Sequence, residues 1–297
     1  MTVIDITTWQ PAGEEMLGTK PKQWVRSPAG ELWLWKESTL QRDLRHGTFR
    51  KGDDWSEVAA GRLGTALGLT VAEVELAVRG PKLGVVSHTV LAEERESLVH
   101  GNELLAEAGF AAADPHDRSG YSVSSVASVL NGVSSPALLA ELTTAFEWFA
   151  GYRVLDVLVG NTDRHQDNWA VIRAGGSARL SPSFDHASCL GFQLSDTERL
   201  DRLDGKGNRT LDAYAEAART KFDHGPSPVQ AAAEAAERVS MTARAHWLRT
   251  VESAPELNDL LTAIPEHRMS DLARRFAAAL YQRNRTALSH ALRTMDA

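Results

Sequence analysis

Two acidic residues and one amide in the middle of the chain form a pattern that suits phosphate chemistry. The segment GNTDRHQDNWAVI at 160–172 carries Asp163 and Asn168, and LSPSFDHAS at 180–188 carries Asp185. Transfer of a phosphoryl group needs a carboxylate that accepts the hydroxyl proton, and oxygen ligands that hold Mg²⁺ on the nucleotide phosphates. Asp163, Asn168 and Asp185 supply those oxygens, so the pattern favours a phosphotransferase.

The order of further candidate residues along the chain supports this interpretation. The step of five residues from Asp163 to Asn168 equals the step from the catalytic Asp to the metal-binding Asn in the protein-kinase catalytic loop. Kinases also use a Lys on a strand and a Glu on the following helix, and Lys36 and Glu57 lie on such predicted elements. The spacing alone is a weak signal, but all four parts in this order, with Asp185 last, favour a kinase.

The same residues leave other interpretations open. Short polar side chains often cap turns in surface loops, so Asn161, Asp163 and Asp167 need have no chemical role. A metal-dependent hydrolase is a second alternative, because histidine and carboxylate side chains bind zinc or manganese. Its candidate ligands are Asp163, His165, Asp167, Asp185 and His186. A third alternative is a nucleotide-binding protein without activity, although every candidate catalytic position is filled.

The N-terminal part of the chain predicts a small β-rich unit that would position the lysine. Residues 23–36, QWVRSPAGELWLWK, contain two extended runs around a Ser-Pro-Ala-Gly turn, a pattern typical of a β-hairpin that ends at Lys36. Apolar residues at helical spacing and then two apolar runs follow. The expected order is strand, strand, helix, strand and strand, with the helix at 52–68 and the last two strands at 74–78 and 84–91.

The remainder of the chain predicts a mostly helical unit. The apolar stripe of residues 136–159 predicts one long buried helix. The runs 168–172 and 178–184 flank a glycine-rich turn and predict a second hairpin. Residues 208–297 are rich in Ala, Glu and Arg and predict helices that are interrupted near 224–228.

Composition narrows the class of protein. The net charge of −7 disfavours a general binder of the nucleic-acid backbone, so no direct nucleic-acid binding is expected. One cysteine, Cys189, excludes an internal disulfide framework. The N-terminus does not resemble a signal peptide, and no apolar run reaches the roughly 18 to 20 residues that span a bilayer. We therefore expect a cytoplasmic protein that does not bind membranes.

The chain resembles the HipA-like serine/threonine kinases, a bacterial branch of the protein-kinase-like fold. The resemblance is specific in GNTDRHQDNWAVI and LSPSFDHAS, covers most of residues 16–190 and is absent in the last 90 residues. Further matching stretches are MLGTKPKQWV at 16–25, ELWLWK at 31–36, GDDWSEVAAGRLGTALGL at 52–69 and LVHGNELL at 98–105.

The resemblance implies a role for each matching residue. Asp163 would be the catalytic base, and Asn168 and Asp185 the Mg²⁺ ligands in the catalytic constellation. Lys36 would contact the nucleotide phosphates, with Glu57 as its partner on the helix. The cofactors implied are ATP and Mg²⁺.

The phosphate loop and the hinge are implied less directly. Residues 99–103 would lie near the hinge where adenine binds. Gly18, Thr19 and Lys20 would belong to the nucleotide-binding loop, but this loop has no G-x-G-x-x-G, and Lys20 and Lys22 would compensate by their charge. HipA-like kinases are known for autophosphorylation in this loop, and Thr19 is the hydroxyl closest to the matching position.

The expected fold is α+β and bilobal, with a β-rich N-lobe at 1–100 and a helical C-lobe at 101–297. The expected acceptor is a protein Ser/Thr hydroxyl, with autophosphorylation in addition, and a small-molecule acceptor is the alternative. The family includes toxin–antitoxin kinases. The chain begins too close to its glycine loop to hold the extra N-terminal subdomain of full-length HipA toxins, so the sequence does not support an antitoxin partner.

Overall fold

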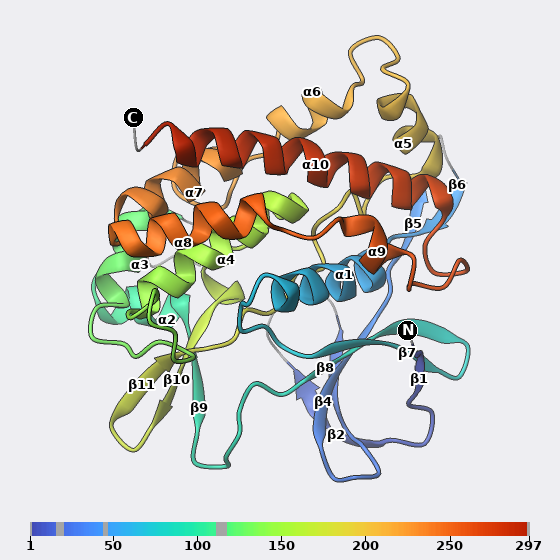
Figure 1. Ribbon diagram of the computed structural model, residues 1–297. Helices are drawn as coiled ribbons and strands as arrows, with labels where there is room; N and C mark the ends of the chain where they lie inside the picture. Colours follow the sequence, from blue (N-terminus) through green and yellow to red (C-terminus); the bar gives the residue numbers. More distant parts are fainter. Residues whose placement is uncertain (1, 16–20, 44–46, 111–117, 296–297) are drawn as a thin grey trace.

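A computed structural model describes residues 2–15, 21–43, 47–110 and 118–295. A large sheet and a smaller one lie beneath a layer of helices (Figure 1). The strand order in the large sheet is β1-β7-β8-β4-β3-β2, with β1 and β7 parallel and the other neighbours antiparallel. Its strands are β1 Ile4–Asp5, β2 Gln10–Glu15, β3 Lys22–Arg26, β4 Leu32–Glu37, β7 Val74–Arg79 and β8 Lys82–His88.

Strand β4 separates an apolar core from a cavity by the alternation of its side chains. Trp33 and Trp35 belong to a buried cluster on one face of the sheet. Leu32, Leu34 and Lys36 alternate with them and line a cavity on the opposite face. Because successive residues of a strand point to opposite faces, burial of the two tryptophans directs Lys36 into the cavity.

Helix α1, Asp53–Ala66, packs against β7 and β8. It begins after Gly52 with Asp53 and Asp54 in its first turn, where carboxylates complement the helix dipole. It ends before Gly68, whose φ of 76° suits a residue that follows a helix. Glu57 lies within this helix and is almost fully buried.

Two smaller sheets complete the β structure. The three-stranded sheet pairs β10 Ala170–Ala174 with both β9 Ser97–His100 and β11 Ser177–Leu180. A separate hairpin joins β5 Leu40–Asp43 to β6 Gly47–Arg50. The predicted hairpins at 23–36 and 168–184 are confirmed. Strands β1, β2, β5, β6 and β9 were not predicted, and β8 ends at His88 rather than at residue 91.

The long helix predicted at 136–159 is shorter in the structure. Helix α4 spans Ala145–Val159, and residues 136–144 form turns before it. Thr144 begins the helix because its hydroxyl accepts from the Glu147 backbone N–H, while the Glu147 carboxylate accepts from the Thr144 N–H. This reciprocal capping box fixes the start of the helix, so the prediction at 136–144 was wrong.

Most of the remaining helices pack on α4 and α10. The helical prediction for residues 208–297 is confirmed. α10 crosses the molecule above α4 and α1 (Figure 1). No helix in the described ranges combines the length and apolarity that crossing a membrane requires. The helices are α2 Gly101–Glu107, α3 Val123–Val129, α5 Asp196–Leu203, α6 Leu211–Glu216, α7 Pro228–Glu237, α8 Met241–Glu252, α9 Leu257–Leu261 and α10 Asp271–Arg293, with a 3₁₀ turn at Gln166–Asn168.

Candidate active site

One cavity of about 780 Å³ receives residues from the large sheet, from α1 and from the loops around β10 and β11. Lys36, Glu57, Asp163, Asn168 and Asp185 all line it. The predicted site residues that lie in the described part of the chain are therefore neighbours in space, although they are far apart in the sequence.

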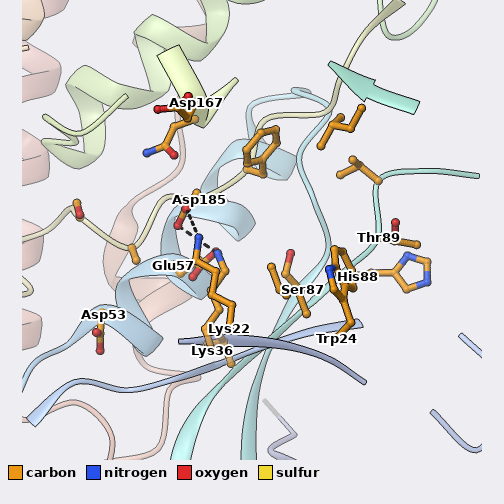
Figure 2. A pocket seen from close by; sticks show the side chains of 18 of the residues that line it. Lys22, Trp24, Lys36, Asp53, Glu57, Ser87, His88, Thr89, Asp167 and Asp185 are labelled. Atoms are coloured by element: carbon orange, nitrogen blue, oxygen red, sulfur yellow. Dashed lines mark hydrogen bonds and ion pairs between the residues drawn. The ribbon is translucent and has the colours of Figure 1, made fainter. Parts of the chain in front are cut away.

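Four charged side chains form a connected ion network in this cavity (Figure 2). Lys36 Nζ lies 2.8 Å from Glu57 Oε1 and 3.1 Å from Asp185 Oδ1. Lys22 Nζ lies 3.2 Å from Asp185 Oδ2. Lys22 and Lys36 are directly opposite each other on β3 and β4, so their side chains share a face of the sheet. The sequence suggested Lys22 only as a compensating charge, whereas it contacts Asp185 directly.

Burial and charge compete within this network. Burial disfavours the charge of Lys36, but Asp185 and Glu57 outweigh burial and raise the pKa of its ammonium. Burial also opposes ionisation of Asp185, yet Lys36 and Lys22 hold the pKa of its carboxyl far below its usual range. The site therefore keeps an ionised carboxylate between two ammonium groups at neutral pH.

The backbone around Asp185 aims its carboxylate into the cavity. Asp185 has a φ of 58°, a conformation that is costly for a residue with a side chain. The next residues are held from both sides, because His186 shares a 2.8 Å hydrogen bond with Ser183 Oγ and the Ala187 carbonyl accepts from Ser56 Oγ at 2.6 Å. Burial, assisted by Arg164, lowers the pKa of His186 to about 3, so this imidazole is neutral and structural.

The loop at 160–168 is shaped by a buried arginine. Arg164 donates through Nε and Nη2 to the Asp156 carboxylate at 2.6 and 2.9 Å, and through Nη1 to the Asn168 carbonyl at 3.0 Å. Asn168 Nδ2 donates to the Asp163 carbonyl at 2.8 Å. These bonds fix the distance between the two ends of the loop, which positions Asp163 and Asn168 at the cavity.

Asp163 has two partners that the sequence did not suggest. Lys221 Nζ lies 3.3 Å from Asp163 Oδ1, and Ser188 Oγ donates to Asp163 Oδ2 at 3.3 Å. Lys221 precedes α7 and is remote in the sequence, so no local motif marks it. Ser188 lies within the matching segment LSPSFDHAS and could have been suspected from its place after Asp185.

The donor set suits a hard cation. Asp185 supplies carboxylate oxygens, and Asn168 can supply its amide oxygen because its amide nitrogen is used by the Asp163 carbonyl. Oxygen ligands of this kind are those Mg²⁺ prefers. Among the described residues, no three His, Cys, Asp or Glu side chains gather into a metal cluster.

The family is decided by comparison with known proteins. Residues 15–247 match the family model of the HipA-like C-terminal domain. The chain belongs to this family. The HipA-like resemblance is thereby confirmed, and its extent is corrected: the match continues past residue 190 into the C-terminal helices, where we expected none.

A HipA-like chain should share its fold with kinases, and it does. The proinflammatory kinase CtkA of Helicobacter pylori is similar with a TM-score of 0.72 at 19% identity, over 99% of this chain and 98% of that one. At this identity the likeness shows the fold alone, which confirms the predicted α+β kinase-like class. Family and fold together support a kinase-like phosphotransferase. A comparison with curated protein sequences gave no match.

Two weaker structural likenesses carry no further argument. The Shewanella oneidensis MR-1 HipA, solved with HipB and operator DNA, has a TM-score of 0.47 at 13% identity, over 96% of this chain and 66% of that one. The Golgi casein kinase has a TM-score of 0.47 at 14% identity, over 98% and 75%.

The predicted nucleotide-binding loop and the predicted hinge differ in how far the structure describes them. Gly18, Thr19 and Lys20 lie outside the described residues. Around the predicted hinge at 99–103, several residues do line the cavity, but the chain leaves the large sheet after His88 and enters the small sheet at Ser97. The connection between the sheets therefore lies at 89–96, slightly before the predicted hinge.

Proposed function

We propose that this chain is an ATP- and Mg²⁺-dependent phosphotransferase that phosphorylates protein Ser/Thr hydroxyl groups, including its own. The observation that carries the proposal is the convergence of the Lys36–Glu57 pair, Asp185 and Asp163 on one cavity. Lysine ammonium groups beside a carboxylate suit the triphosphate and its metal, and a second carboxylate suits the acceptor hydroxyl.

The cavity offers a different environment to each part of the nucleotide. Leu32, Leu34 and Val85 line the cavity and would provide apolar walls for the base. Leu34 is opposite Ser87 in the sheet, and Ser87, His88 and Thr89 also line the cavity (Figure 2). Bases bind in such largely apolar clefts with a few polar groups that fix their orientation. The base would therefore lie beside the connection at 89–96, with its phosphates directed toward the lysines.

The polar end of the cavity would perform the chemistry. Lys36 and Lys22 would bind phosphate oxygens and keep them oriented, while Glu57 holds Lys36 in place. Mg²⁺ bound by Asn168 and Asp185 would neutralise charge on the phosphates. Asp163 would accept the proton of the acceptor hydroxyl as that oxygen attacks.

We also propose a division into two lobes, for which the sequence suggested a boundary after residue 100. The pairing of β9 with β10 favours a boundary within the connection at 89–96, because it assigns β9 to the same lobe as the 160–168 loop.

The test combines activity with identification of the acceptor. The protein would be incubated with labelled ATP and Mg²⁺ in a cell lysate, and the labelled products identified by mass spectrometry. Asp163→Asn should lower the transfer rate by about 10² to 10⁴ while the fold persists. Asp201→Asn is the matched control, since Asp201 pairs with Lys206 at 3.0 Å on the surface, away from the cavity. If only small molecules were labelled, the proposal of a protein acceptor would be refuted. A normal transfer rate in Asp163→Asn would refute the assignment of Asp163 as the catalytic base.

A further inference from the structure

We propose that Lys221 is a further catalytic residue. Its ammonium group would contact the transferring phosphoryl group from the side on which Asp163 lies. The inference deepens the proposed function and rests on it. Its first support is the contact itself: Lys221 Nζ lies 3.3 Å from Asp163 Oδ1, while Ser188 occupies Oδ2. Lys22 and Lys36 contact Asp185 instead, so among the described residues Lys221 is the lysine that lies beside the Asp163 carboxylate.

The chain on both sides of Lys221 is fixed. Thr220 closes a short loop, because its backbone N–H and its hydroxyl both donate to the Pro226 carbonyl at 2.9 and 3.0 Å. Phe222 is buried, with its ring 4.6 Å from that of Tyr121 and 5.0 Å from the guanidinium of Arg153. A lysine on an ordinary surface loop has no such anchors on its two neighbours.

The same anchors also hold the loop that carries Asp163. The Tyr121 carbonyl accepts from the Asp223 N–H at 2.7 Å, and the Tyr121 hydroxyl donates to the Arg164 carbonyl at 3.0 Å. One buried tyrosine therefore connects the segment of Lys221 to the residue after Asp163. This connection keeps the segment of Lys221 and the loop of Asp163 in a fixed relative position, so the positive charge of the ammonium is already in place for the reaction.

The group that the Lys221 ammonium stabilises would change during the reaction. The acceptor oxygen forms a bond to the γ-phosphorus of ATP, the bond from that phosphorus to the bridging oxygen breaks, ADP leaves, and the hydroxyl proton passes to Asp163. Protonation removes the negative charge that Lys221 faces. The ammonium is then available to the phosphoryl oxygens as charge spreads over them, so it binds the transition state more strongly than the ground state.

The kinetic test separates catalysis from binding. Lys221→Met should lower kcat by about 10²-fold, with the KM for ATP changed by less than about threefold, and Lys221→Arg should retain a larger part of the rate. Lys206→Met is the matched control, because Lys206 is also paired to an aspartate but is 60% exposed and remote from the cavity. A kcat of Lys221→Met within about threefold of wild type would overturn the inference.

A binding test decides the same point without turnover. ADP, Mg²⁺ and aluminium fluoride imitate the transferring phosphoryl group, so fluoride should raise the melting temperature of the wild-type complex above that with ADP and Mg²⁺ alone. Lys221→Met should keep the response to ADP and lose the extra response to fluoride. If the wild type transfers no phosphate, the proposed function fails. An equal fluoride response in the two proteins, or none in the wild type, overturns the role of Lys221.

Discussion

Arg268 connects the last part of the chain to α1, which carries Glu57, and to β8, which pairs with the strand that carries Lys36. Its replacement by methionine tests that connection. Its guanidinium is buried and donates through Nη2 to the carbonyls of Ala77 and Gly84 at 2.8 and 2.9 Å. Nη1 lies 3.4 Å from Asp54 Oδ2, in the first turn of α1. One side chain thus joins β7, β8 and α1.

The expected loss of stability depends on pH. Removal of one partner of a buried ion pair destabilises by roughly 3–5 kcal/mol. Burial, opposed by Arg268, already raises the pKa of Asp54 to about 6. A carboxyl group whose pKa is raised on folding contributes most to the free energy of unfolding when the pH is below the pKa that it has in the unfolded chain. This stabilisation is lost as the pH rises through the pKa that the group has in the folded protein. Loss of Arg268 raises the pKa of Asp54 further, and each added unit increases the destabilisation at pH 8 relative to pH 5 by about 1.4 kcal/mol.

The assay is urea denaturation of Arg268→Met, Asp54→Asn and the double variant at pH 5 and pH 8. Arg268→Met should be clearly less destabilised at pH 5, and at pH 8 Asp54→Asn should rescue part of its loss. Arg274→Met is the matched control, because Arg274 also donates to backbone carbonyls, those of Leu261 and Ile264, and should show no such pH dependence. The reasoning would be refuted if Arg268→Met lost the same free energy of unfolding at both pH values and if the losses of the two single variants added up to that of the double variant.

Two further predictions concern the nucleotide. Asp185→Asn should abolish most of the rise in melting temperature that ATP and Mg²⁺ produce together, because a hard dication needs the carboxylate oxygen; a rise equal to that of wild type would exclude Asp185 as a ligand. Intact-mass measurement after incubation with ATP and Mg²⁺ should show one phosphate in wild type and none in Thr19→Ala or Asp163→Asn, since Thr19 is the hydroxyl that the HipA-like resemblance assigns to the autophosphorylated loop; a phosphate retained by Thr19→Ala would exclude that site.

The sequence predicted those parts of the site whose spacing is local. Asp163 and Asn168 lie within one loop, so their spacing in the sequence was enough to predict that they lie close together. Lys36 and Glu57 were predicted from their order along the chain, a lysine at the end of a strand and a glutamate on the helix that follows, and their pairing was implied by the HipA-like resemblance. Their contact at 2.8 Å then follows from the packing of that helix against the sheet.

The structure departs from prediction where local pattern and tertiary context disagree. β2, with the sequence QPAGEE, contains Pro11 and Gly13 and lacks apolar alternation, features tolerated at the edge of a sheet, where it lies. Residues 136–144 carry apolar side chains at helical spacing, yet Leu138 is fully exposed. A signal for the true helix start was present, because Thr144 and Glu147 form the T-x-x-E pattern of a capping box.

The C-terminal segment contacts elements that carry candidate site residues, although no sequence motif indicates these contacts. At one end, Arg268 holds α1 and β8. At the other, Leu280 of α10 packs against Gly160, where an added Cβ would lie 3.2 Å from the leucine side chain. Gly160 has a φ of 66° and joins α4 to the loop that carries Asp163.

The family match ends at residue 247, inside α8, and Trp247 is itself buried against α4 with its indole N–H donating to the Glu147 carbonyl at 2.9 Å. That end is therefore not a boundary of folding. Residues beyond it contact α1 and β8 through Arg268, and contact Gly160, at the start of the loop that carries Asp163, through Leu280. Substitutions in α10 and in the turn before it should consequently act on the active site as well as on stability, although none of those residues lines the cavity.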